Sequence, residues 1–200
     1  MQKNLDSKFY VNTLKEGEYQ DREKTLLLVI DEQERLMPAM EEGELTVINT
    51  EALIKAFQRF GVKVIATEQY PKGLGRSDKR ILDLLDDNQF YEKTAFNGTI
   101  PEIMKYITEN AIENILVTGS EGHVCVYQTI RSLLDLGYNV FYIEDAISSY
   151  SLRLKDTAKE SLRDMGAVIV NTEMVLFDLA KDSKDENFKF ISDLVKGIRQ

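Results

Sequence analysis

The chain alternates short apolar segments with longer segments of helical periodicity. Residues 24–31 contain a continuous apolar run that ends in Asp31, which is typical of a strand buried on both faces of a parallel sheet. We expect further strands at residues 62–67, 114–118, 139–144 and 167–170, and helices at residues 46–60, 99–109, 124–136, 152–165, 172–180 and 187–198. The alternation predicts a three-layer α/β/α fold with a mostly parallel sheet of five to six strands.

The length of 200 residues fits one domain. Residues 1–20 are polar, and we expect them to form an N-terminal arm ahead of a domain at residues 21–200. This start lacks the apolar stretch of a signal peptide, and the longest apolar runs are far shorter than the roughly 20 residues that span a bilayer. The sequence therefore predicts a cytoplasmic protein with no membrane partner.

Composition argues against several classes of function. The 34 acidic and 25 basic residues give a net charge of −9, which argues against affinity for nucleic acid, because surfaces that bind it are usually basic. One cysteine excludes an internal disulfide, and one cysteine with one histidine cannot supply a Cys/His zinc site. We therefore expect no metal, no cofactor and no nucleic-acid partner.

Reactive side chains follow two of the expected strands. Asp31 ends the first strand, and residues 119–125 join the strand at 114–118 to the next helix. Parallel strands present their carboxyl ends at one edge of a sheet, so we expect Asp31 and Cys125 to meet there. N–H groups at a helix N terminus favour a thiolate and can bind an oxyanion, and the aspartate can accept the thiol proton. The pattern predicts a nucleophilic cysteine, although a lone cysteine is also common as a small buried residue.

Four segments carry a family resemblance: LLLVIDEQERL around Asp31, ATEQYPKGLG at 66–75, YEKTAFN around Lys93, and VTGSEGHVCVYQTIRSLLDLGYNVFYIEDAISS at 117–149. Through them the sequence resembles the isochorismatase-like cysteine hydrolases, and within these the isochorismatase-domain-containing proteins. The resemblance covers roughly residues 24–196. It implies a Rossmann-like α/β fold and a catalytic triad of Asp31, Lys93 and Cys125.

The resemblance also implies a role for each triad residue. Asp31 would accept the thiol proton and later activate water, Lys93 would stabilise the charge on both partners, and Cys125 would attack a carbonyl carbon. The backbone N–H groups of Glu121 and Cys125 would form the oxyanion hole. In this family the turn often contains a cis peptide bond, which would fall here between Ser120 and Glu121.

Residues beside the family motifs are candidate substrate contacts: Gln33, Gln69, Tyr70 and Phe96. Phe96 equally fits a core position, and Tyr70 equally fits a loop anchor. His123 is expected to be structural or to line the pocket. Family members that act as nicotinamidases carry a metal site rich in His and Asp, which a chain with one histidine lacks. The presence of Cys125 favours attack on an amide, imide or ester-like carbon.

Three classes of function remain. The first is a metal-independent cysteine hydrolase acting on a small molecule, the second is a non-catalytic binding or scaffold protein, and the third is a nuclease. The complete triad argues against the second class, and the acidic composition and the lack of a motif of paired metal-binding carboxylates argue against the third. We also expect a homo-oligomer, because the apolar stripe of the helix at 187–198 could pack on a partner, although it could equally pack on its own sheet.

Overall fold

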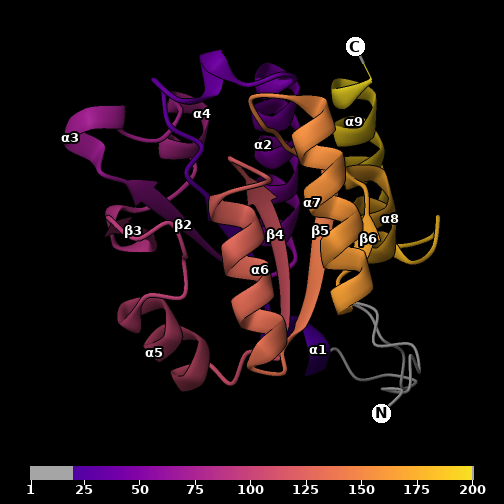
Figure 1. Cartoon of the computed structure of the whole chain (residues 1–200). Coiled ribbons are helices and arrows are strands. Elements are labelled where there is room, and N and C mark those ends of the chain that lie inside the picture. Colours follow the sequence, from indigo (N-terminus) through magenta and orange to yellow (C-terminus); the bar gives the residue numbers. More distant parts are fainter. Residues whose placement is uncertain (1–19, 200) are drawn as a thin grey trace.

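The computed structural model describes residues 20–199 and contains one six-stranded sheet (Figure 1). Its strands are β1 (Thr25–Ile30), β2 (Lys63–Gln69), β3 (Phe90–Lys93), β4 (Asn114–Gly119), β5 (Asn139–Ile147) and β6 (Val168–Val170). All neighbouring strands are parallel, in the order β3-β2-β1-β4-β5-β6. The predicted parallel sheet is confirmed. The predicted arm at residues 1–20 lies outside the described residues, apart from Gln20.

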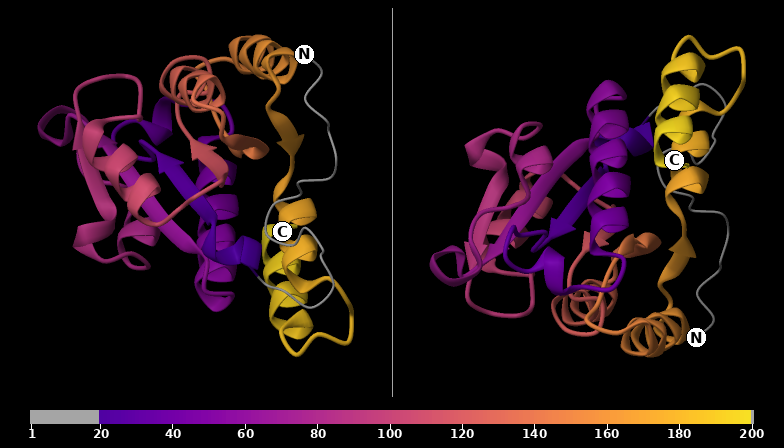
Figure 2. Two further views of the ribbon diagram at one scale, coloured as in Figure 1. Left: turned by 90° about the horizontal axis from the view of Figure 1, so that it is seen from below. Right: turned by 90° about the horizontal axis from the view of Figure 1, so that it is seen from above.

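Helices cover both faces of the sheet, as predicted. They are α1 (Gln20–Glu23), α2 (Gly43–Arg59), α3 (Pro71–Leu74), α4 (Lys79–Leu82), α5 (Pro101–Glu109), α6 (Cys125–Asp135), α7 (Leu152–Met165), α8 (Thr172–Ala180) and α9 (Phe188–Ile198), with 3-10 helices at Met37–Ala39 and Asp87–Gln89. Helices α5, α6 and α7 pack on one face, and α2, α8 and α9 pack on the other. Figure 2 shows α6 and α7 on one side of the strands and α2 on the opposite side.

The side chains of the central strand β1 are buried in two hydrophobic cores, one on each face of the sheet. Leu27 and Val29 belong to the core beneath α2, α8 and α9, whereas Leu26, Leu28 and Ile30 belong to the core beneath α5, α6 and α7. Successive side chains of a strand point to opposite faces, so a strand between two helical layers must be apolar at every position. This is the physical reason for the continuous apolar run in the sequence.

The structure differs from the sequence predictions at one edge of the sheet. Strand β3 was not expected, because a segment of four residues with two charges lacks an apolar run. It forms by pairing on one side only, with Ala66–Gln69 of β2. Strand β2 also runs two residues beyond the predicted end at residue 67, to Gln69, and the short helix α3 follows it. Helix α2 also begins earlier than predicted, at Gly43.

The apolar stripe of α9 packs within the molecule. Ile191 and Val195 are buried in the core that α9 shares with α2 and α8, and Phe188, Leu194 and Ile198 pack against it. Of the two alternatives for this stripe, packing on its own sheet layer is the one that the structure shows. The apolar stripe of α9 therefore no longer supports a homo-oligomer, which stays a prediction.

The connections of the sheet reverse direction between β1 and β4. Strands β2 and β3 follow β1 on one side, and β5 and β6 follow β4 on the other. Such a reversal leaves a crevice at the carboxyl ends of the two central strands. Gly119 ends β4 there, with a φ of 116° and so close to β1 that a Cβ atom would lie 2.0 Å from the carbonyl oxygen of Ile30. Only glycine fits this approach.

We predict that Gly119→Ala lowers the free energy of unfolding by at least about 3 kcal/mol, because neither backbone can move away. Gly137→Ala is the matched control. Gly137 also has a positive φ, of 90°, but nothing lies within 4 Å of the position of its Cβ. The control should lose only about 1–2 kcal/mol, from the left-handed backbone itself. Urea unfolding measures the free energy of unfolding of both variants. Equal losses in the two would contradict the prediction that the close approach of Gly119 to Ile30 admits only glycine.

Glu32 follows β1 into the interior beneath α2. It is 1% exposed, and its Oε1 accepts a hydrogen bond of 2.7 Å from the Thr50 hydroxyl of α2. Its Oε2 is also buried, and the Thr118 hydroxyl lies near the same carboxyl group. Burial raises the pKa of Glu32 from 4.5 to about 8, while the bond from Thr50 lowers it. Burial therefore favours the protonated form of Glu32 near pH 7.

We predict that Glu32→Gln stabilises the protein increasingly as the pH rises from 4.5 to 8. In this window the unfolded chain releases the Glu32 proton and the folded chain keeps it, so wild-type stability falls with pH, by up to about 1.4 kcal/mol per pH unit. The amide has no proton to release. Urea unfolding at several pH values measures the difference, with the exposed Glu92→Gln as control. A gain that does not grow with pH would contradict the prediction.

Candidate active site

Asp31 lies at the carboxyl end of β1, where the chain turns with a left-handed φ of 51°. Its carboxylate is fully buried, and each oxygen accepts a hydrogen bond. Oδ1 accepts a hydrogen bond of 2.6 Å from the Thr67 hydroxyl of β2, and Oδ2 accepts one of 2.6 Å from the Lys93 ammonium. The backbone N–H of Asp31 donates to the Thr67 carbonyl at 3.1 Å. Backbone and side chain together fix the direction of the carboxylate.

Lys93 is the last residue of β3, and its side chain is 0% exposed. Besides Asp31, its ammonium lies 3.0 Å from Oε1 of Gln69, 3.3 Å from the carbonyl oxygen of Ala95 and 3.4 Å from that of Phe96. A buried ammonium is costly unless acceptors surround it. Here each acceptor lies on the sheet edge or on the loop directly after β3. The loop is therefore tied to the ion pair.

Cys125 is the first residue of α6 and is 7% exposed. Burial raises the pKa of its thiol to about 12, and the charge of Asp31 and a hydrogen bond to it act in the same direction. The charge of Lys93 and the backbone N–H of Glu121 lower this pKa. Burial and the neighbouring carboxylate thus outweigh the groups that favour the thiolate.

The turn between β4 and α6 brings backbone N–H groups to the thiol. The peptide bond between Ser120 and Glu121 is cis, as the resemblance implies. The carbonyl of Glu121 accepts from the N–H groups of Val124 and Val126, which closes the turn. In the described part of the chain, the N–H of Cys125 donates to no backbone carbonyl. The N–H of Glu121 lies at the Cys125 sulfur, and an oxyanion hole formed by the N–H groups of Glu121 and Cys125 stays a prediction.

Gln33 and Gln69 lie beside the triad, and their amides are engaged by the protein. Gln33 is 0% exposed, and its Nε2 donates to the carbonyls of Gln69 and Gly75 while its Oε1 accepts from the N–H of Gln69. Gln69 is partly exposed, and its Nε2 donates to the carbonyl of Thr94. Both side chains therefore bind backbone groups of the segments that surround the triad.

Tyr70 and Phe96 present exposed rings, with 55% and 54% of their surface accessible. The N–H of Tyr70 donates to the carbonyl of Lys93, and the Tyr70 ring lies so close to Gly73 that a Cβ there would be 2.7 Å from it. Phe96 is no core residue, which rejects one alternative for it. Both residues are attached to Lys93 through their backbones. A role in substrate contact stays a prediction for each.

Three further residues lie around the site that no sequence motif indicated. Thr67, the last residue of the strand expected at residues 62–67, is the hydroxyl partner of Asp31. Ser149 is buried, and its hydroxyl lies 3.3 Å from Nδ1 of His123. Tyr150 is exposed, and its N–H donates to the Glu121 carboxylate at 3.3 Å. A polar residue at the end of a buried strand was the available signal for Thr67, whereas Ser149 and Tyr150 follow β5 without such a signal.

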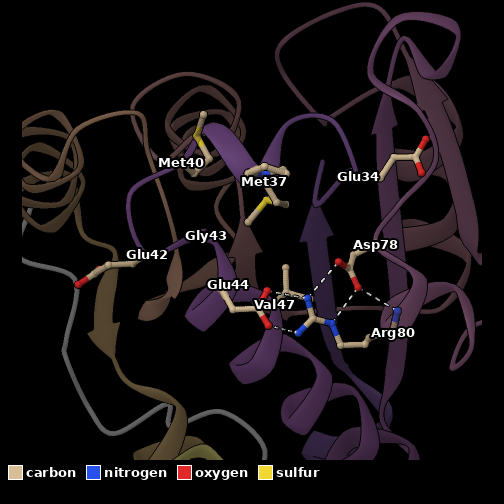
Figure 3. Close-up of a pocket in the computed structure, with 10 residues that line it drawn as sticks. Glu34, Met37, Met40, Glu42, Gly43, Glu44, Val47, Asp78 and Arg80 are labelled. Carbon is tan, nitrogen blue, oxygen red and sulfur yellow. Dashed lines mark hydrogen bonds and ion pairs between the residues drawn. The ribbon is translucent and has the colours of Figure 1, made fainter.

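A cavity of about 400 Å³ lies at the start of α2, on the face of the sheet opposite to Cys125 (Figure 3). In it Arg80 lies between two acids, with 2.7 Å to Glu44 and 2.9 Å to Asp78. No triad residue is among its lining residues. The cavity is therefore separate from the candidate active site.

Within residues 20–199, no group of three or more His, Cys, Asp and Glu side chains is arranged to hold a metal ion. Every helix in the same range falls short of the length and apolarity that a bilayer span requires.

Comparison with known proteins shows the family. The isochorismatase domain matches residues 25–174. Isochorismatase family protein 1A of Dictyostelium discoideum is 34% identical over 88% of this chain and 88% of that protein. The secreted isochorismatase effector Isc1 of Phytophthora sojae is 33% identical over 86% of this chain and 84% of that protein. The solved structure of the MAR1 ribonuclease from Caenorhabditis elegans has a TM-score of 0.82 at 31% identity, and the match covers 88% of this chain and 91% of that chain. This chain therefore belongs to the isochorismatase family.

Proposed function

We propose that this protein is a metal-independent cysteine hydrolase that cleaves an amide, imide or ester-like bond of a small molecule. The observation that carries the proposal is the buried placement of Asp31, which is held by Lys93 at 2.6 Å and lies against the Cys125 thiol. A carboxylate fixed beside a thiol at a helix N terminus is the arrangement that nucleophilic catalysis requires. Membership of the isochorismatase family supports the assignment to hydrolases.

The first half of the reaction transfers the acyl group to the protein. As the sulfur of Cys125 attacks the carbonyl carbon, the thiol proton moves to Asp31 and the carbonyl oxygen takes the negative charge. The N–H groups of Glu121 and Cys125 stabilise that oxyanion. When the intermediate collapses, the bond to the leaving group breaks and Asp31 returns the proton to that group. A thioester on Cys125 remains.

The second half releases the acyl group. Asp31, again a carboxylate, takes a proton from water as the water oxygen attacks the thioester carbon. The carbon–sulfur bond then breaks, the acid product leaves, and the proton on Asp31 returns to the sulfur. Lys93 stabilises the negative charge of Asp31 in both halves and keeps the carboxylate in one position. The protein ends in its starting form, and one water has been consumed.

The name of one relative suggests a different activity. The Caenorhabditis elegans protein is called a ribonuclease, and the match to it covers most of this chain. The net charge of −9 disfavours RNA binding, and the triad chemistry acts on carbonyl carbon. RNA cleavage that survives Cys125→Ala and repeated purification would support a nuclease and contradict the hydrolase proposal.

The compartment and the oligomeric state stay predictions. Another relative is named as a secreted effector, so family membership leaves a cytoplasmic location open. Light scattering at micromolar concentration tests the predicted homo-oligomer, and a monomer there would contradict it.

We predict that the Cys125 thiolate is absent below about pH 10 in the wild-type protein, because burial and Asp31 raise the pKa of the thiol to about 12. Asp31→Asn should move the titration to lower pH, because it removes the nearest negative charge and leaves Lys93. Thiolate absorbance in the ultraviolet measures both, with Cys125→Ser as the blank. A wild-type step near the ordinary thiol pKa of about 8.5 would refute the assignment.

We predict that intact-mass spectrometry finds an acyl adduct on Cys125 when the protein meets a library of small amides, imides and esters. The adduct should be absent from Cys125→Ala and should form roughly 100-fold more slowly in Asp31→Asn, because proton transfer in the attack is lost. The exposed Asp164→Asn is the matched control and should behave as the wild type.

The mass of the adduct identifies the acyl group and so narrows the substrate class. The absence of any adduct and of any turnover across the library would favour the alternative, a non-catalytic binding or scaffold protein that retains the fold.

A further inference from the structure

Gln69 lies between the triad and the outside of the protein. Its Oε1 accepts from the Lys93 ammonium at 3.0 Å, and its Nε2 donates to the carbonyl of Thr94 at 3.0 Å. This pattern allows one orientation of the amide, because a flipped amide would place its NH₂ against the ammonium and its oxygen against a carbonyl. The amide therefore spans from the buried cation to the loop that follows β3.

The backbone of Gln69 is itself fixed by Gln33. The last pair of the β1–β2 ladder is Ile30 with Thr67. Beyond it, the Gln33 side chain replaces a strand backbone, accepting from the N–H of Gln69 at 2.8 Å and donating to its carbonyl at 3.1 Å. A third hydrogen bond of Gln33, of 2.6 Å from its Nε2, goes to the carbonyl of Gly75. The position of the Gln69 side chain is therefore determined by the sheet and does not depend on a ligand.

Strand β2 lies between the strands that carry the two charged partners. In the sheet order, β3 with Lys93 lies on one side of β2, and β1 with Asp31 lies on the other. Thr67 and Gln69 are two positions apart on β2, so both point to the same face. Thr67 binds Asp31, and Gln69 binds Lys93. Each of the two side chains thus forms a hydrogen bond with one partner of the ion pair.

We propose that Gln69 is a positioning residue that holds the Lys93 ammonium against Asp31 and so sets the reactivity of Cys125, in place of the substrate contact that its motif suggested. The inference rests on the proposed function, because it assigns Gln69 to the same triad. Lys93 lowers the pKa of the Cys125 thiol. A less well held ammonium therefore leaves the thiol less reactive even when no substrate is present.

The test measures alkylation of the only cysteine by iodoacetamide at one fixed pH, followed by intact-mass spectrometry. Gln69→Met keeps the length of the side chain and removes the acceptor, and alkylation should slow by about threefold or more. Gln69→Glu places a second carboxylate against Lys93 and turns an oxygen toward the Thr94 carbonyl, and alkylation should slow about tenfold, the effect of one pKa unit. Glu92→Gln, on the exposed side of β3 beside Lys93, is the matched control and should alkylate at the wild-type rate.

Wild-type alkylation rates in both Gln69 variants would overturn the inference. That result, combined with a changed KM for any compound that acylates Cys125, would return Gln69 to the substrate contacts. A loss of stability alone, measured by urea unfolding, with an unchanged alkylation rate would also overturn it. Alkylation needs no substrate, so slower alkylation in the variants supports the role of Gln69 even if the wild-type protein hydrolyses nothing in the library. The alkylation experiment therefore tests the role of Gln69, whereas the absence of adducts and turnover in the library tests the hydrolase proposal.

Discussion

The buried ion pair between Lys93 and Asp31 is the interaction on which the site depends. Both side chains are 0% exposed, and their charged atoms lie 2.6 Å apart. Removing two charges from water is expensive, and their mutual attraction compensates only when further hydrogen bonds satisfy each partner. Thr67 supplies such a bond to Asp31, and Gln69 and two loop carbonyls supply them to Lys93. The buried ion pair thus needs the polar residues at the carboxyl end of β2 and the carbonyl groups of the loop after β3.

The sheet order explains how residues far apart in sequence meet. Asp31 follows β1, Lys93 ends β3, and Cys125 begins the helix after β4, so the triad gathers at one carboxyl edge on both sides of the central strand. The close approach of Gly119 to Ile30 brings the turn before Cys125 against the end of β1. Every strand that contributes is parallel to its neighbour, which is why all the contributing ends face the same way.

Much of this arrangement could be predicted from the sequence, for reasons that differ between elements. Five strands carry continuous apolar runs because two helical layers bury them, and a run is visible without a structure. Strand β3 has no such run, since it exists through pairing with β2. The family motifs indicated the triad, but no pattern of residue types tells whether the amide of Gln69 faces a substrate or Lys93. The pKa of Cys125 was likewise out of reach, because it depends on burial and on the distance to Asp31.

The raised pKa of Cys125 is consistent with a nucleophile once the charge of the whole site is considered. In the resting form, one negative charge lies on Asp31 beside the positive charge of Lys93, and the thiol is neutral. Moving the thiol proton to Asp31 exchanges the positions of charge and proton and leaves the net charge of the buried site unchanged. A free thiolate beside an ionised Asp31 would instead add a second negative charge where water cannot screen it. In the proposed reaction, attack and proton transfer are therefore coupled. In the proposed reaction, the N–H groups of Glu121 and Cys125 stabilise the charge that develops on the carbonyl oxygen, and within residues 20–199 neither donates to a backbone carbonyl.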